Sequence, residues 1–255
     1  MMNGRLYVVA CPIGNKEDIT LRALRVLREA DIIAAEDTRR ALDLLAAHGI
    51  PAQGRVVSCF EHNEQRRSAE LLDSIQQGRS VALITDAGTP SVSDPGFYLV
   101  RSAVAQDIDV VPVPGVSAAV AALSVSGMPT DAFVFAGFLP KKQGKRSRRL
   151  AELAGQTATL IFYEAPLRAA VFMAELADAL GDRRAVVCRE MTKPHEEFIR
   201  GTLSQLAAAL EDRDAVKGEI TVVVEGAEPA EEMPDAEELA EVVRNASCSA
   251  SELAR

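Results

Sequence analysis

Apolar residues along the first half of the chain follow two alternating patterns. Short apolar runs predict buried strands, and apolar residues that recur every three or four positions predict helices packed by one face. The predicted strands cover residues 6–11, 32–35, 56–58, 81–85 and 110–113. The clearest helical spacings lie at 19–30 and 69–75. Strands that alternate with helices in this way predict a mostly parallel sheet covered by helices.

The pattern changes after Pro112 and Pro114. A helix-like segment comes first, and the predicted strands then follow one another with fewer helices between them. The expected helices are 116–126, 167–180 and 203–210, and the expected strands are 133–137, 159–163, 185–189, 197–202 and 220–224. The sequence therefore predicts a second α/β domain with a mixed sheet.

The segment after the predicted strand at 81–85 has an unusual composition. Residues 86–96, DAGTPSVSDPG, hold two glycines, two prolines and two aspartates. Proline removes an amide donor and fixes φ, and glycine permits backbone shapes that side chains block. A simple turn before a helix at 97–106 would explain one glycine and one proline, but hardly the whole set. Ligands of open α/β sheets bind at the carboxyl ends of strands, where this loop lies, so the sequence favours a ligand site.

Three other predicted strands of the first half also end in polar segments, at 12–15, 36–39 and 61–64. Because parallel strands place their carboxyl ends at one edge, we expect these segments to meet the 86–96 loop. The first of them, PIGN, lacks both the GxGxxG spacing and the P-loop lysine, which gives little support to a nicotinamide or nucleoside triphosphate site. The four cysteines are far apart and show no metal-ligand spacing, so no metal is expected.

The net charge of −9 is unevenly distributed. Eight acids and two arginines lie at 227–255, which leaves −3 for the rest of the chain. Within that rest, residues 141–149, KKQGKRSRR, carry six cations, a local cluster that can hold phosphates whatever the global charge. A solvated loop that enters a helix near Ser147 explains the same run equally well.

Composition also indicates how the chain divides into domains and in which cellular compartment the protein is expected. We expect domains at 1–112 and 113–226, followed at 227–255 by an acidic linker and a short helix near 235–243. The apolar run at 6–11 is too short for a signal peptide core or a membrane span. Few cysteines and no leader predict a cytoplasmic protein with no membrane partner.

Two further segments carry a family resemblance. Residues 114–118, PGVSA, open a helix of small residues, and 162–166, FYEAP, end a strand. Together with 6–15, 35–39, 86–96 and KGEI at 217–220, they resemble the tetrapyrrole methylase superfamily of S-adenosylmethionine methyltransferases. The similarity is closer still to its ribosomal RNA branch, the small-subunit ribosomal RNA methyltransferase I family, which 2′-O-methylates a cytidine in the decoding region.

The resemblance implies a two-domain α/β enzyme with S-adenosylmethionine in the cleft between the domains, commonly as a homodimer. On that template Thr89 stands where the family usually has an acid, which leaves either Asp86 or Asp94 to supply a carboxylate. The residues that the resemblance places at the cofactor are Pro12, Asp86, Gly88, Thr89, Pro90, Ser91, Val92, Asp94, Gly115, Ser117, Ala118, Tyr163, Met191 and Thr192.

The implied chemistry is an in-line displacement from a sulfonium to a ribose hydroxyl, so most of the rate must come from holding donor and acceptor in position. A base near the hydroxyl would add roughly 10²-fold or more. The candidates are Asp37, His62, Glu64 and Lys193. Asp37 could instead cap a helix or pair with Arg39, and His62 could be an ordinary loop residue.

The implied partner is 16S ribosomal RNA or the small ribosomal subunit. The cations expected to hold its backbone are Arg39, Lys141, Lys142, Lys145, Arg146, Arg148 and Arg149. Three alternatives stay open: a tetrapyrrole methylase, a protein methylase similar to diphthine synthase, and a non-catalytic binder of cofactor or RNA. The first would need an open cleft without a basic rim, and the last would bind the cofactor without labelling any product.

Overall fold

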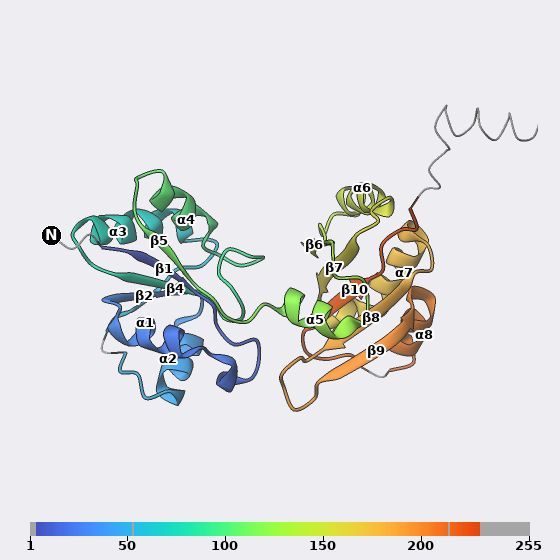
Figure 1. Cartoon of the computed structure of the whole chain (residues 1–255), viewed down its shortest axis with the longest axis horizontal. Helices are drawn as coiled ribbons and strands as arrows, with labels where there is room; N and C mark the ends of the chain where they lie inside the picture. The colour runs from blue at the N-terminus through green and yellow to red at the C-terminus, as the bar shows by residue number, and fades with distance from the viewer. Residues whose placement is uncertain (1–3, 53, 214, 230–255) are drawn as a thin grey trace, which may run out of the picture.

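A computed structural model describes residues 4–52, 54–213 and 215–229. The chain forms two lobes, each built on a five-stranded sheet (Figure 1). In the first lobe all pairings are parallel and the strand order is β3-β2-β4-β1-β5. These strands are β1 (Leu6–Val9), β2 (Ile32–Ala35), β3 (Val56–Ser58), β4 (Val81–Ile84) and β5 (Val110–Val113).

Helices cover both faces of the first sheet. They are α1 (Leu21–Glu29), α2 (Thr38–Ala47), α3 (Glu64–Gln76) and α4 (Phe97–Val104), with a short 3-10 turn η1 (Lys16–Asp18). Alternate strand residues face α1 and α2 on one side and α3 and α4 on the other, as the period of two in a strand requires. Thr20 caps α1 by accepting a hydrogen bond from the Ala23 amide, 3.1 Å away.

The second lobe contains a mixed sheet in the order β6-β7-β10-β8-β9. Only the β6–β7 pair within it is parallel. The strands are β6 (Phe133–Phe138), β7 (Thr159–Glu164), β8 (Arg184–Arg189), β9 (Glu197–Thr202) and β10 (Ile220–Val224). One face packs on α6 (Gln143–Ala154), α7 (Ala169–Leu180) and α8 (Leu203–Glu211), and the other packs on α5 (Ala118–Ser126). The 3-10 turn η2 (Pro166–Arg168) precedes α7.

The predicted fold class, a parallel sheet followed by a mixed one, is confirmed. The strand expected at 6–11 ends at Val9, because Cys11 instead bridges to Gly88 across the edge of the sheet. Helix α6 begins at Gln143, earlier than the expected start near Ser147. The chain crosses between lobes after β5 and before α5, where we place the domain boundary. The helix expected near 235–243 lies outside the described residues.

Within the described ranges, no helix is both long enough and apolar enough to cross a membrane.

Candidate functional site

Three loops interlock at the carboxyl edge of the parallel sheet. The Cys11 and Gly88 backbones exchange two hydrogen bonds, with N–O distances of 2.8 and 3.0 Å. The Asp37 amide donates to Asp86 Oδ1 at 3.1 Å, and the Asp86 amide lies 3.3 Å from Glu36 Oε2. The polar segments that follow β1, β2 and β4 therefore meet, as the parallel strands predicted.

The 86–96 loop holds an unusual backbone shape. Gly88 and Gly96 have φ of 75° and 128°, and two serines, Ser91 and Ser93, also have positive φ, at 70° and 63°. A non-glycine residue in this region costs roughly 1–3 kcal/mol and persists only where its surroundings hold it. The loop is thus a strained shape maintained by its contacts.

Glu64 supplies one of those contacts. Its side chain is buried at the start of α3, and its Oε1 accepts hydrogen bonds from the amides of Gly96 and Tyr98 at 3.0 and 2.8 Å. These amides open α4, where backbone donors lack partners within the helix and a negative charge is favoured. The expectation that Glu64 removes a substrate proton needs correction, because its carboxylate is buried and committed to the α4 amides.

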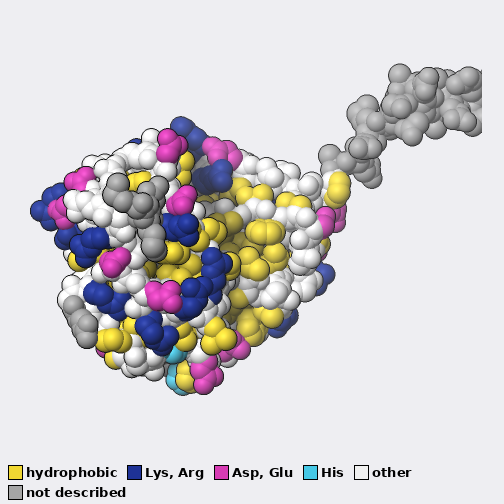
Figure 2. Space-filling model, turned by 60° about the vertical axis from the view of Figure 1, so that its left-hand side comes forward, with side chains coloured by type: hydrophobic (Ala, Val, Ile, Leu, Met, Phe, Trp, Pro, Cys, Tyr) yellow, Lys and Arg dark blue, Asp and Glu magenta, His cyan; other side chains and the backbone are white. Residues whose placement is uncertain are grey.

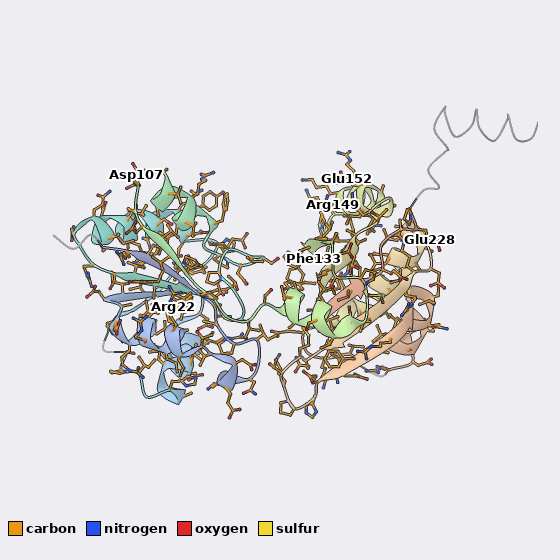
Figure 3. The ribbon with its side chains drawn as sticks, in the orientation of Figure 1. Arg22, Asp107, Phe133, Arg149, Glu152 and Glu228 are labelled. Atoms are coloured by element: carbon orange, nitrogen blue, oxygen red, sulfur yellow. The ribbon has the colours of Figure 1, made fainter. Side chains whose placement is uncertain are left out.

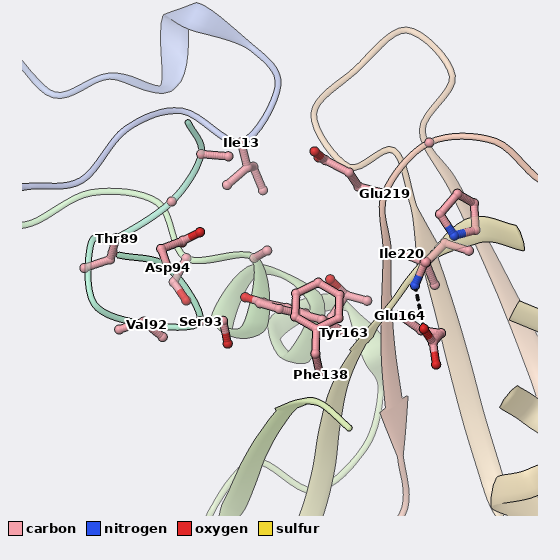
Figure 4. A pocket seen from close by; sticks show the side chains of 18 residues that line it. Ile13, Thr89, Val92, Ser93, Asp94, Phe138, Tyr163, Glu164, Glu219 and Ile220 are labelled. Atoms are coloured by element: carbon pink, nitrogen blue, oxygen red, sulfur yellow. Dashed lines mark hydrogen bonds between the residues drawn. The ribbon is translucent and has the colours of Figure 1, made fainter. Parts of the chain in front are cut away.

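A cavity of about 410 Å³ lies between the two lobes (Figure 4). The first lobe lines it with Ile13 and residues 87–89 and 92–94. The second lobe contributes Ser117 and Ala118 at the start of α5, Phe138 at the end of β6, and two segments at 163–166 and 218–221.

Half of the residues expected at the cofactor line this cavity. They are Gly88, Thr89, Val92, Asp94, Ser117, Ala118 and Tyr163. The sequence did not single out Ile13, Phe138, Glu219 and Ile220, which also line the cavity. The motif at 217–220, which carried part of the family resemblance, contains Glu219 and Ile220. It was the feature of the sequence that could have identified these two residues.

The other expected cofactor residues lie around this cavity rather than in its lining. Gly115 approaches Ala10 so closely that an added Cβ would lie 2.8 Å from the alanine Cβ. Met191 is buried in the core beneath α5. Thr192 Oγ1 accepts a hydrogen bond from the Asn15 amide at 3.0 Å and so joins the two lobes. Pro90 and Ser91 belong to the loop itself, and Pro12 and Asp86 line a second, smaller cavity.

Two aromatic rings form one end of the interlobe cavity. The Tyr163 ring meets Phe138 and Phe135 edge to face, with centroids 5.5 and 5.0 Å apart. Burial raises the pKa of the Tyr163 hydroxyl, so the ring stays neutral. A flat, neutral aromatic wall of this kind is suited to an adenine ring.

The cavity is also lined by three acidic residues, Asp94, Glu164 and Glu219, of which Glu164 pairs with Arg146. Burial, and then the nearby charges of Glu36, Asp86 and Glu219, raise the pKa of Asp94 to about 7. Burial also raises the pKa of Glu36. Such a group of carboxylates attracts a cation. The start of α5 lines the same cavity, and its first-turn amides can take a carboxylate. The cavity therefore offers aromatic rings, carboxylates and helix amides to a ligand.

Two of the other three base candidates, Asp37 and His62, occupy ordinary structural positions. Asp37 caps α2 by accepting the Arg39 amide at 2.8 Å, and the Arg39 guanidinium and amide lower its pKa to about 2. This matches the alternative of a cap paired with arginine. His62 lies in an exposed turn with its ring 6.2 Å from that of Phe60. Neither lines the interlobe cavity.

The cation run at 141–149 divides into one buried arginine and several exposed side chains. Arg146 is 2% exposed, pairs with Glu164 and Glu175, and lies over the Phe172 ring. The expectation that it touches RNA is therefore wrong. Lys141, Lys142, Lys145 and Arg148 are exposed, and Arg149 pairs with Glu152 on α6 (Figure 3).

Figure 2 shows Lys and Arg side chains spread over the first lobe, beside a hollow of hydrophobic side chains. Arg39 belongs to the first lobe and is highly exposed, although it pairs with Asp37 at 2.7 Å. In the part of the chain that the structure describes, no group of three His, Cys, Asp or Glu residues is placed to hold a metal.

Solved structures share this fold. A uroporphyrin-III C-methyltransferase from Thermus thermophilus, complexed with S-adenyl homocysteine, aligns with a TM-score of 0.57 at 22% identity, covering 86% of this chain and 97% of that one. A diphthine synthase aligns with a TM-score of 0.65 at 16% identity, covering 87% and 90%. At these identities the likeness defines the fold alone.

The sequence comparison defines the class. The family model "Tetrapyrrole (Corrin/Porphyrin) Methylases" matches residues 5–207. Fold, cleft and family model together make the chain a methyltransferase of the tetrapyrrole methylase class, whose methyl donor is S-adenosylmethionine.

Curated relatives narrow the class further. A ribosomal RNA small subunit methyltransferase I from Mesorhizobium japonicum is 51% identical over 90% of this chain and 78% of its own length. Proteins of the same name from Micromonospora olivasterospora and Halalkalibacterium halodurans are 49% and 48% identical over 88% of this chain, and over 71% and 76% of their own lengths. The chain belongs to the ribosomal RNA small subunit methyltransferase I family.

Proposed function

We propose that this protein transfers a methyl group from S-adenosylmethionine to the 2′-hydroxyl of a cytidine ribose in the decoding region of 16S ribosomal RNA. The observation that carries the proposal is the interlobe cavity with its aromatic end, acidic side chains and helix N-terminus. The names of the curated relatives support ribosomal RNA as the acceptor.

Each part of the cavity has a role in holding the donor. Tyr163 and Phe138 would contact the adenine, and the amides at the start of α5 would bind the methionine carboxylate. Asp94 and Glu219 would face the positive charges of the sulfonium and the amino group. Bound there, S-adenosylmethionine supplies a methyl group on a cationic sulfur.

The protein contributes chiefly by fixed geometry. Well-oriented reactants reach effective molarities on the order of 10⁵ M or more, provided that the site does not relax. The strained 86–96 loop is held by Glu64 from one side and by the Cys11–Gly88 hydrogen bonds from the other. We assign Asp37 and Glu64 positioning roles, since both hold the loops around the cavity. No role is assigned to the exposed His62.

The exposed cations between residues 141 and 149, before α6 and in its first half, are proposed to hold the phosphates of the RNA. Lys141, Lys142, Lys145 and Arg148 are exposed on the second lobe, just before α6 and in its first turns, with Arg149 next to them. Arg39 on α2 offers a further cation on the first lobe.

Labelling tests this function directly. The protein would be incubated with methyl-labelled S-adenosylmethionine and small ribosomal subunits from cells that lack the modification, and the label would be mapped. We expect the label on the 2′-oxygen of one cytidine in the decoding region. Label on a base, on a ribosomal protein or on no component would refute the proposal.

We also propose that the protein acts in the cytoplasm as a homodimer. Large apolar side chains are exposed along α5 and on the sheet edge formed by β6, namely Val120, Val125 and Phe133. Light scattering at micromolar concentration should give twice the chain mass, and Val120→Glu combined with Phe133→Glu should lower it. A wild-type mass of one chain would contradict the dimer.

A further inference from the structure

A second cavity of about 250 Å³ adjoins the interlobe cavity. The loop after β1, the end of β4 and one face of α2 form most of it, and Lys193 and Glu219 complete it from the second lobe. Ligand pockets for drug-sized molecules measure roughly 300–1,000 Å³, so this one suits a smaller fragment.

The two cavities share a wall of three residues, Ile13, Ala87 and Glu219. Figure 4 shows Ile13 and Glu219 together at one end of the interlobe cavity, with Phe138 at the other. A group bound in the second cavity therefore lies next to Ile13 and Glu219 of the first cavity, away from Phe138.

The lobes meet closely at this wall. An added Cβ on Gly14 would lie 2.5 Å from Lys193 Cγ and 2.8 Å from Thr192 Oγ1, so only glycine permits the approach. Lys193 Nζ pairs with Glu190 at 2.7 Å and with Glu219 at 3.0 Å. The close approach at Gly14 and the ion pairs of Lys193 therefore hold the residues around the second cavity in place.

Its lining combines an apolar surface with charges at the rim. Ala41 and Leu44 provide the apolar part from α2. Arg40 is 63% exposed at the side chain and lies 3.5 Å from Asp86 Oδ2, a loose pair that a phosphate can replace. Lys16 Nζ reaches the Asp43 carbonyl at 3.4 Å, also a weak contact.

We propose that this second cavity receives the acceptor nucleotide, with its ribose at the shared wall and its phosphates at Lys16 and Arg40. The inference rests on the proposed function and names the part of the molecule that takes the acceptor. Enzymes that modify one nucleotide commonly bind it splayed out of the strand in a small pocket, where apolar side chains contact the base.

The reaction balances in this arrangement. The ribose oxygen forms a bond to the methyl carbon as the carbon–sulfur bond breaks, and the sulfur keeps the bonding pair and becomes neutral. The hydroxyl proton passes to the Asp86 carboxylate or to water. Asp86 lines the second cavity, so it takes the acceptor side rather than the donor side that the resemblance suggested.

A pair of tryptophan variants on α2 tests the placement. Leu44→Trp fills the second cavity, and Leu42→Trp puts the same side chain on an exposed position of the same helix. Calorimetry should show that both bind S-adenosylmethionine within about 2-fold of wild type. With saturating cofactor, Leu44→Trp should methylate ribosomal subunits at least about 100-fold more slowly, since misplaced reactants lose that much. A wild-type rate in Leu44→Trp would overturn the inference.

Arg40, at the rim of the second cavity, allows an independent test of the proposed phosphate contact. Arg40→Ala should raise the KM for ribosomal subunits about 10-fold, the loss of one charge-assisted hydrogen bond, and lower the salt slope by about one. Arg22→Ala, an exposed arginine on α1, is the matched control and should behave as wild type. Equal KM values for the two variants would contradict the role of Arg40.

Nucleotide binding separates this inference from the proposed function. Cytidine 5′-monophosphate would be titrated into protein loaded with S-adenosylhomocysteine and followed by saturation-transfer NMR. Binding by wild type and by Leu42→Trp, with loss in Leu44→Trp, supports the cavity even if ribosomal RNA receives no label. Absence of binding to wild type, or equal binding to Leu44→Trp, overturns it.

Discussion

Asp94 lines the interlobe cavity, and its ionisation is unfavourable in the folded protein. Its pKa of about 7 means that the empty protein holds the carboxyl partly protonated near neutral pH. A cationic ligand favours the ionised form, so ligand binding and proton release are linked at this residue. The neighbouring carboxylates that raise its pKa also make the cavity attractive to a cation.

The affinity for S-adenosylmethionine should therefore rise as pH increases from about 6 to 8, through the pKa of Asp94. Asp94→Asn should bind more weakly and lose most of this pH dependence. Calorimetry at several pH values measures both effects. An equally steep pH dependence in Asp94→Asn would assign the titration to another group.

The same pKa has a stability consequence of defined sign. Because the folded-state pKa lies above the ordinary value of 3.8, ionisation of Asp94 destabilises the fold progressively as pH rises from about 4 to 7. Asp94→Asn should raise the Tm at pH 8 by a few degrees and leave it nearly unchanged at pH 4. An equal Tm shift at both pH values would contradict this account.

Arg146 and Arg148 look alike in the sequence but differ in the structure. Arg146 is buried between Glu164 and Glu175, and removal of one partner from a buried pair costs about 3–5 kcal/mol. Arg146→Ala should lose that much free energy of unfolding in urea, whereas exposed Arg148→Ala should change it by less than about 0.5 kcal/mol. Similar values for the two variants would disprove the burial argument.

At the scale of elements, the 86–96 loop depends on helices on either side of it. Glu64, the first residue of α3, holds the start of α4 and thereby the end of the loop. This contact joins residues more than thirty positions apart in the sequence. It connects the turn after β3 with the loop that lines the interlobe cavity.

Glu64→Ala should destabilise the protein by about 2–3 kcal/mol and weaken cofactor binding, because buried amides lose their acceptor. Glu64→Gln keeps an acceptor oxygen and should restore much of both. Urea unfolding and calorimetry give the two readings, with Glu61→Gln as an exposed control. A general base would behave differently: Glu64→Gln would then lose turnover at full stability and full cofactor affinity.

The strands and their loops also show which parts of the structure could be predicted from the sequence. The sequence pattern located β2, β3, β5, β9 and β10 to the residue, and parallel strands correctly predicted that the polar loops converge. The pairing of Arg146 with Glu164 was not visible, because an internal arginine looks like its exposed neighbours in a cation run. The role of Glu64 was also hidden, since its partners are backbone amides whose positions depend on the tertiary fold.

At the scale of the whole molecule, two cationic surfaces lie on different parts of the fold. Figure 1 places α6 on the upper side of the second lobe and α2 on the lower side of the first. A ribosomal subunit, the substrate that we propose, is large enough to contact both surfaces, and we propose that its acceptor nucleotide lies at the α2 side.

Replacement of Lys141, Lys142, Lys145 and Arg148 by glutamine should weaken subunit binding and lower the salt slope by up to about 3, at roughly 0.7 per phosphate contact. Cofactor affinity should stay at the wild-type value, since none of these residues lines the interlobe cavity. Filter binding over a range of salt concentrations measures the slope. Unchanged subunit affinity would mean that these cations are only solvated and do not contact the RNA.

The central claim is that the methyl donor lies between the lobes, with its adenine at Tyr163 and Phe138 and its cationic end at Asp94 and Glu219. A crystal structure of the protein soaked with S-adenosylmethionine tests this most directly. We expect electron density for the donor in the 410 Å³ cavity in that orientation. Donor density elsewhere on the molecule, or the reverse orientation within the cavity, would contradict the account.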